Sequence, residues 1–174
     1  VDIQEGAIEQ LKLGIEHSQT TGIIPVCVDL KELWEDAPRG MLDLVTCNPP
    51  YKVVGAGFES AIDAQRIARH EIMCTIDDVC AAAEKLLKFG GRLCVCNRPE
   101  RLSDVIFAMK SNNIEPKRIR FVSKNPDEAP WLFLIEGKKG SKPFMKVEPQ
   151  LYIRSGEGFS EELQKIYDTG KESL

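Results

Sequence analysis

Aliphatic runs and helix-like spacings alternate along this chain. Short apolar runs bounded by turn residues predict strands over residues 23–30, 42–47, 92–96, 119–122 and 131–136. Apolar residues three and four apart predict helices around residues 8–15, over 76–89, after Arg98-Pro99-Glu100, and from Ser160 onward. This order predicts an α/β fold, with a Rossmann-like, mostly parallel sheet and helices on both faces. The last two strands should pair antiparallel, because only a short turn joins them.

Individual boundaries follow from the turn and capping residues. Thr75 is expected to cap the helix that begins at Ile76, and Gly90-Gly91 to end it. The run 42–47 is short, rich in aliphatic residues and bounded by turn-forming residues, and we expect it to be a buried strand. A long connection follows from Lys52 to Thr75, where a lid or a substrate clamp would be placed.

The composition, with 43% hydrophobic and 29% charged residues over 174 positions, is typical of one soluble domain. No apolar run approaches the roughly 18 residues of a membrane span, and the first residues do not resemble a signal peptide. The net charge of −4 means that any contact with RNA must use a local basic patch. None of the six cysteines has Cys-x-x-Cys spacing, so no metal site is expected. Buried, reduced thiols in a cytoplasmic protein are the better interpretation.

The sequence Asn48-Pro49-Pro50-Tyr51 directly follows the predicted strand 42–47. The Asn48 side-chain oxygen and the Pro49 carbonyl can each accept one hydrogen bond from the same planar amino group. The two prolines restrict the backbone, and Tyr51 can stack on the ring that carries the amino group. The alternative is a Pro-Pro turn with Tyr51 packed in the core.

Two acids end the two strand-like segments that precede this tetrapeptide. Asp2 is placed to accept hydrogen bonds from ribose hydroxyls, and Asp29 from an adenine amino group. Taken alone, either acid fits a helix cap or a solvated carboxylate better than a cofactor contact.

Several segments in one order resemble the bacterial tRNA(Val) (adenine-N6)-methyltransferase family. They are Asn48–Tyr51, Ala68–Glu71, Gly90–Arg92, Arg98–Leu102 and Glu115–Phe121, and the resemblance spans roughly residues 1–153. It implies a class I methyltransferase sheet and S-adenosyl-L-methionine (SAM) as cofactor. It further implies that Asp2, Ile3, Asp29, Leu30 and Asn48 bind the cofactor. The tetrapeptide Asn48, Pro49, Pro50 and Tyr51 is implied to hold the adenine amino group.

In that family, the first strand and a Gly-rich SAM loop precede the position of Asp2. We therefore expect residues 1–174 to be a single catalytic domain that lacks its N-terminal part. On this view the chain is the C-terminal portion of a larger protein.

Basic residues offer candidate RNA contacts, with tRNA the substrate that the resemblance implies. Arg69 and His70 lie in the long connection, and Lys117, Arg118 and Arg120 precede or occupy a strand. Together with Lys138, Lys139 and Lys142, the latter three are candidates for a phosphate-binding patch, or for ordinary surface charge. Two other functions stay open. One is methylation of a protein glutamine or of another RNA or DNA amino group, and the other is non-catalytic RNA binding.

Overall fold

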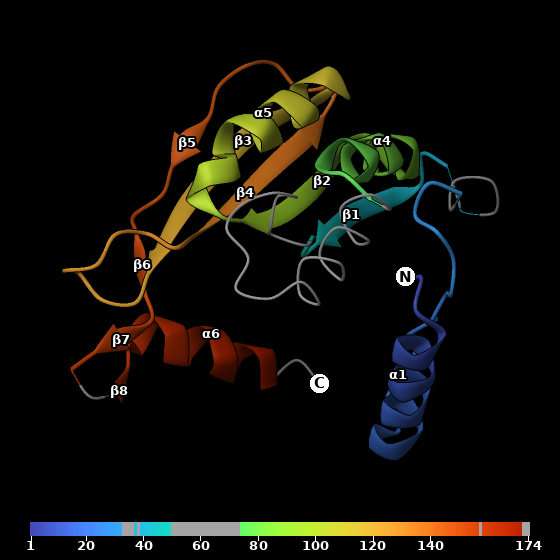
Figure 1. Ribbon diagram of the computed structural model, residues 1–174, viewed down its shortest axis with the longest axis horizontal. Coiled ribbons are helices and arrows are strands. Elements are labelled where there is room, and N and C mark those ends of the chain that lie inside the picture. Colours follow the sequence, from blue (N-terminus) through green and yellow to red (C-terminus); the bar gives the residue numbers. More distant parts are fainter. Residues whose placement is uncertain (33–36, 38, 50–73, 157, 172–174) are drawn as a thin grey trace, which may run out of the picture.

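The computed structural model describes residues 1–32, 37, 39–49, 74–156 and 158–171 of the chain (Figure 1). The predicted connection over 52–75 lies almost entirely outside these residues. The helices are α1 (Glu5–Ser18), α4 (Ile76–Leu86), α5 (Leu102–Ser111) and α6 (Glu161–Lys171), and a 3-10 turn, η1 (Pro99–Arg101), precedes α5. The long strands are β1 (Leu42–Cys47), β2 (Leu87–Asn97), β3 (Ile114–Ser123) and β4 (Leu132–Lys139). Four two-residue strands follow: β5 (Lys146–Val147), β6 (Leu151–Tyr152), β7 (Arg154–Ser155) and β8 (Gly158–Phe159).

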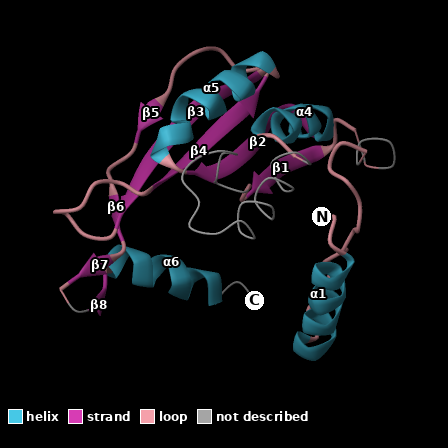
Figure 2. Cartoon of the chain, viewed as in Figure 1, coloured by secondary structure: helices cyan, strands magenta, loops and turns pink. Residues whose placement is uncertain are grey.

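The main sheet has the strand order β1-β2-β4-β3-β5, with β6 also paired to β3 (Figure 2). β1 and β2 are parallel, β4 is antiparallel to both of its neighbours, and β5 and β6 are parallel to β3. Every strand of this sheet except β4 therefore runs in the same direction. The predicted mostly parallel sheet with one antiparallel strand near the C-terminus is confirmed, and so is the antiparallel pairing of β3 with β4.

Helices α4 and α5 lie together over one face of this sheet and form the main core with it (Figure 1). The helix after Arg98-Pro99-Glu100 forms as predicted, and Val105 and Met109 of α5 are fully buried. Leu93 and Phe133 face them from β2 and β4 with no exposed surface. Thr75 caps α4 as expected: its side-chain oxygen accepts from the Asp78 amide at 3.2 Å, and the Asp78 carboxylate accepts from the Thr75 amide at 2.8 Å.

Helix α6 packs on the opposite face of the sheet. Leu163 joins Val122 and Leu151 in a second, smaller cluster. The two faces are therefore covered differently. α4 and α5 bury one face, while α6 contacts the other near the end of β3. None of the described helices combines the length and apolar character that a membrane span requires.

Three predictions about individual elements are wrong. Gly90-Gly91 does not end α4, because the helix stops at Leu86 and the glycines lie inside β2. The β1–β2 register shifts between Leu42 and Leu44, and Gly90 has a φ of 77°, so the glycines form an irregular, bulge-like stretch of strand.

The segment 23–30 is not a strand. It makes one isolated bridge, between Cys27 and Asp2, which two backbone hydrogen bonds of 3.1 Å flank. A single bridge is too short to form a β-ladder, so no strand is formed. Strand β1 forms as predicted, but it is not fully buried: Leu44 is 52% exposed. Leu44 lies two positions before Thr46, on the sheet face opposite α4 and α5, so these helices do not cover its side chain.

Candidate functional site

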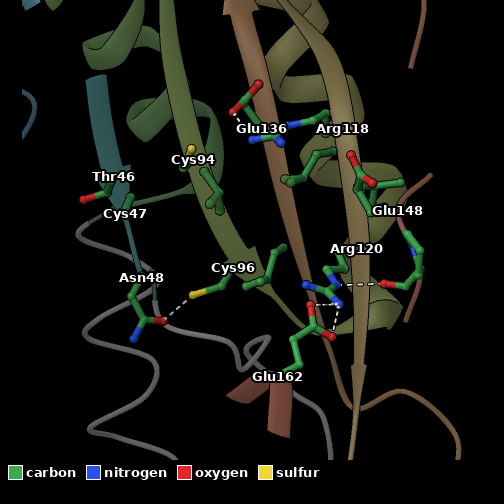
Figure 3. Close-up of a pocket in the computed structure, with 15 residues that line it drawn as sticks. Thr46, Cys47, Asn48, Cys94, Cys96, Arg118, Arg120, Glu136, Glu148 and Glu162 are labelled. Carbon is green, nitrogen blue, oxygen red and sulfur yellow. Dashed lines mark hydrogen bonds and ion pairs between the residues drawn. The ribbon is translucent and has the colours of Figure 1, made fainter. Parts of the chain in front are cut away.

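A cavity of about 870 Å³ lies on the sheet face opposite α4 and α5 (Figure 3). All four long strands and α6 contribute to its wall. Its lining consists of Thr46, Cys47, Asn48, Cys94, Val95, Cys96, Arg118, Ile119, Arg120, Leu134, Ile135, Glu136, Glu148, Pro149 and Glu162. The cavity therefore brings Asn48 together with residues more than 100 positions later in the chain, such as Glu162.

Strand register explains the set of residues on this face. Thr46 pairs with Cys94, Cys94 with Glu136, and Glu136 with Arg118, which gives one row of side chains across β1, β2, β4 and β3. Because side chains alternate between faces, residues two positions further along each strand form the next row on the same face. That second row comprises Cys96, Leu134 and Arg120, with Asn48 following β1 at its end.

Asn48 stands where the prediction placed it, directly after β1 and on the cavity wall. Its side chain is exposed, whereas Pro49 is buried and anchors the backbone behind it. The thiol of Cys96 donates a hydrogen bond to the Asn48 side-chain oxygen, with 3.1 Å between sulfur and oxygen (Figure 3). An amide oxygen accepts along two directions, so this bond fixes the orientation of the amide plane. Pro50 and Tyr51 lie outside the described residues.

None of the six cysteines, all of which lie in the described residues, forms a disulfide bond. Only Cys80 is fully buried; Cys27 is exposed, so the expectation of uniformly buried thiols is wrong. Burial, with smaller contributions from Cys74 and Cys96, raises the pKa of Cys47 from 9.0 to about 11. Burial also raises the pKa of Cys94, assisted by Glu136 and opposed by Arg118 and Arg92. These two thiols are therefore protonated at neutral pH.

The arginines of the cavity wall are held by carboxylates. Arg118 donates to Glu136 at 2.8 Å, and this bond is the main cause that raises the pKa of Arg118. Arg120 donates to the Pro149 carbonyl at 2.7 Å and pairs with Glu162 of α6 at 2.7 Å. The wall therefore presents paired charges beside the thiols and Asn48.

The two predicted cofactor acids lie on neighbouring segments. The bridge between Asp2 and Cys27 is parallel, so the chain runs in the same direction through Asp2–Ile3 as through Asp29–Leu30. One oxygen of Asp2 accepts from the Gln4 amide at 2.9 Å, and one of Asp29 from the Lys31 amide at 2.9 Å. A carboxylate can accept further bonds, so these contacts leave the acids suited to ribose hydroxyls or an adenine amino group.

Electrostatics connects Asp29 to the residue just before the cap of α4. Burial, then the charges of Asp78 and Asp29, raise the pKa of Cys74. Asp29 therefore lies within electrostatic reach of Cys74. Asp2 and Ile3 are connected to this region through the single bridge to Cys27.

The predicted phosphate-binding patch is divided among different places. Arg118 and Arg120 line the cavity, whereas the Lys117 amino group donates to the Lys142 carbonyl at 3.0 Å. Lys139 pairs with Glu84 at 3.0 Å and donates to the Leu87 carbonyl at 3.0 Å, so it links β4 to the end of α4. Arg69 and His70 lie outside the described residues. Over the same described part of the chain, no three His, Cys, Asp or Glu side chains gather as a metal ion would require.

Sequence reasoning missed Cys96, Glu136 and Glu162 as cavity residues. The alternation of Cys94 and Cys96 with Leu93 and Val95 was a usable signal, because it places both thiols on the face opposite the core. Glu136 and Glu162 had no such signal. Their position depends on the register of β4 and on where α6 packs.

No protein-family model matches this sequence, and no curated protein matches it significantly. Solved structures do match. A predicted O-methyltransferase from Agrobacterium tumefaciens superposes with a TM-score of 0.74 at 16% identity, covering 95% of this chain and 74% of its own. A SAM-dependent methyltransferase from Aquifex aeolicus has a TM-score of 0.55 at 9% identity, with 78% and 65% covered. The geranyl diphosphate C-methyltransferase from Streptomyces coelicolor has a TM-score of 0.55 at 10% identity, with 80% and 64% covered.

At identities of 9–16%, what these proteins share with this chain is the fold. The chain has the Rossmann-like α/β fold of the SAM-dependent methyltransferases.

Proposed function

We propose that this protein transfers a methyl group from SAM to the exocyclic N6 amino group of an adenine in tRNA. The observation that carries the proposal is the position of Asn48. It follows β1 at the carboxyl edge of a methyltransferase sheet and projects to an 870 Å³ cavity, while buried Pro49 anchors the turn. Open α/β sheets bind their ligands at this edge.

SAM, when bound, supplies an electrophilic methyl carbon and leaves as S-adenosylhomocysteine. The protein has to prepare the amino nitrogen, whose lone pair is delocalised into the adenine ring. The Asn48 oxygen and the Pro49 carbonyl accept one N–H bond each, which favours a tetrahedral nitrogen with its lone pair directed away from the ring. Alignment of the reacting atoms then supplies much of the rate. Methyl transfer from bound SAM would leave this nitrogen cationic, and it would then release its proton.

Residues suited to hold the cofactor are present. Asp2 and Asp29 lie on paired, parallel segments, and Asp29 is within electrostatic reach of Cys74 at the start of α4. Carboxylates at the ends of such segments suit ribose hydroxyls and an adenine amino group. Asp2, Ile3, Asp29 and Leu30 would therefore hold the nucleoside part of SAM, with Asn48 beside its methyl group.

The choice of adenine in tRNA is supported by sequence rather than by geometry. The tetrapeptide alone suits any planar amino group, and the later segments, such as Arg98–Leu102, resemble the tRNA family. A base in folded RNA must be unstacked before its amino group reaches such a pocket.

The test uses the complete protein with isotopically labelled SAM and total tRNA from a strain that lacks the gene. We expect label in N6-methyladenosine after nucleoside mass analysis. Asn48→Ala should lower kcat by about 10²–10³, in line with the loss of one transition-state hydrogen bond, and should weaken SAM binding far less. Gln10→Ala removes an exposed amide from α1 and serves as the control. Label found in protein glutamine, or parallel loss of kcat and SAM binding in Asn48→Ala, would contradict the proposal.

A further inference from the structure

Trp131 is an aromatic side chain held rigid at the surface. It lies directly before β4, and its backbone N–H donates to the Val122 carbonyl at 3.1 Å. The Arg98 guanidinium lies over the Trp131 ring, 5.2 Å from the centroid, and also donates to the Trp131 carbonyl at 3.0 Å. Despite these contacts, Trp131 is 43% exposed, whereas Phe133, two residues later, is fully buried. Packing alone would favour a buried ring at this position as well.

The Trp131–Arg98 pair lies at the same edge of the sheet as Asn48. β2 ends at Asn97, which is 4% exposed and accepts from the Arg98 amide at 2.8 Å, so the direction of Arg98 is fixed as the strand ends. β4 is two strands from β1 in the sheet order. Asn48 directly follows Cys47, which pairs with Val95, and is therefore about level with Leu134, three positions after Trp131. At about 4.8 Å per strand and about 3.3 Å per residue, Trp131 lies roughly 10 Å from Asn48 across the strands and roughly 10 Å beyond it along them, or about 14 Å in all. A short extended stretch of single-stranded nucleic acid spans that distance.

We propose that the Trp131–Arg98 pair is a stacking site for an unpaired base of the substrate RNA, a few nucleotides from the adenine held at Asn48. This inference rests on the proposed function. Proteins recognise unstacked bases in RNA by stacking them on aromatic rings and guanidinium planes. A tryptophan ring with a guanidinium over it offers both surfaces, and the arginine charge lies close to the phosphates that flank a stacked base. Because the Trp131–Arg98 pair is already held in place in the free protein, less conformational entropy is lost when a base binds.

Tryptophan fluorescence tests the contact directly. The chain has two tryptophans, so Trp34→Phe leaves Trp131 as the only one. We expect a short adenine-containing single-stranded RNA to quench its emission in the complete protein. An RNA of the same length and charge, with abasic positions beside the adenine, should quench far less. Equal quenching by both RNAs would overturn the inference, because a charge effect alone would then explain the signal.

Affinity and turnover provide a second test. Trp131→Ala should weaken RNA binding roughly five- to fifty-fold and raise the KM for tRNA, while kcat and the SAM Kd stay unchanged. Trp131→Phe keeps an aromatic face and should recover most of the affinity. Phe107→Ala removes another exposed aromatic side chain, 72% exposed on α5, and is the matched control.

The outcomes separate the two proposals. Unchanged RNA affinity in a folded Trp131→Ala variant overturns the stacking site and leaves the proposed methylation standing. Absence of methyl transfer to RNA by the parent protein, together with base-dependent quenching, overturns the proposed reaction and leaves the stacking site standing. A thermal melt of each variant, compared with Trp131→Phe, distinguishes a lost contact from a lost fold.

Discussion

The hydrogen bond from Cys96 to Asn48 makes the Cys96 thiol a positioning group for the proposed reaction. Cys96→Ala removes this donor, and with it a hydrogen bond that orients the Asn48 amide. The bond length is 3.1 Å, but a thiol is a weak donor, so we assign it the lower half of the usual net hydrogen-bond range, about 0.5–1 kcal/mol. If that energy orients Asn48 in the transition state, kcat falls roughly two- to five-fold.

Steady-state methyl transfer by the complete protein measures this effect, with the SAM Kd determined separately. Cys96→Ser retains a donor and should recover part of the lost kcat. Cys94→Ala removes a thiol from the same face of β2, one row away, and reports the effect of lost wall volume. If Cys94→Ala and Cys96→Ala lower kcat equally, or if Cys96→Ser is no better than Cys96→Ala, the thiol does not position Asn48.

Three further predictions concern stability and the α6 contact. In Gly137→Ala the added Cβ would lie 2.5 Å from Ile114 Cγ2, so the unfolding free energy measured by urea titration should fall by about 1–3 kcal/mol. Adding Ile114→Leu should recover part of this loss. An unchanged urea midpoint in Gly137→Ala would refute the clash. The folded-state pKa of Cys47 is raised from 9.0 to about 11, so its stabilising contribution is full below pH 9 and is lost as pH rises through 11. Urea midpoints for wild type should therefore fall more steeply over that interval than those for Cys47→Val, and parallel curves would contradict this. Arg120→Met removes the 2.7 Å ion pair to Glu162, and amide exchange within α6 should accelerate while that of α5 does not; uniform acceleration would indicate general destabilisation instead.

Much of the fold follows from local sequence, because its elements are bounded by strong local signals. The Thr75 cap, the stop at Asn112-Asn113 and the turn at 125–130 each depend on residues close in sequence. The position of Asn48 was predictable for the same reason, since it needs only the end of one strand. The antiparallel pairing of β4 follows from the short turn before it.

The errors arise where distant partners decide the outcome. Gly90-Gly91 resembles a helix stop locally, but Leu87 pairs with Leu42 and is fully buried, so the chain is already in β2 before the glycines. The run 23–30 has strand character, yet one bridge to Asp2 is its pairing in the described structure. The cavity wall depends on register across four strands, and no local pattern brings Glu136 beside both Arg118 and Cys94.

The pairing of the cavity charges bears on how RNA would be held. Arg118 and Arg120 were candidates for phosphate contacts, but each is engaged by a carboxylate at 2.8 Å or less. A phosphate would have to displace Glu136 or Glu162, whose negative charges oppose its approach. A neutral base does not have to displace a carboxylate, and the cavity wall beside Asn48 offers it contacts with thiols and Leu134. The cavity is therefore better suited to the base than to the backbone, and RNA affinity has to come from elsewhere on the protein. The exposed edge at Trp131 and Arg98 supplies stacking and charge at the right end of the sheet.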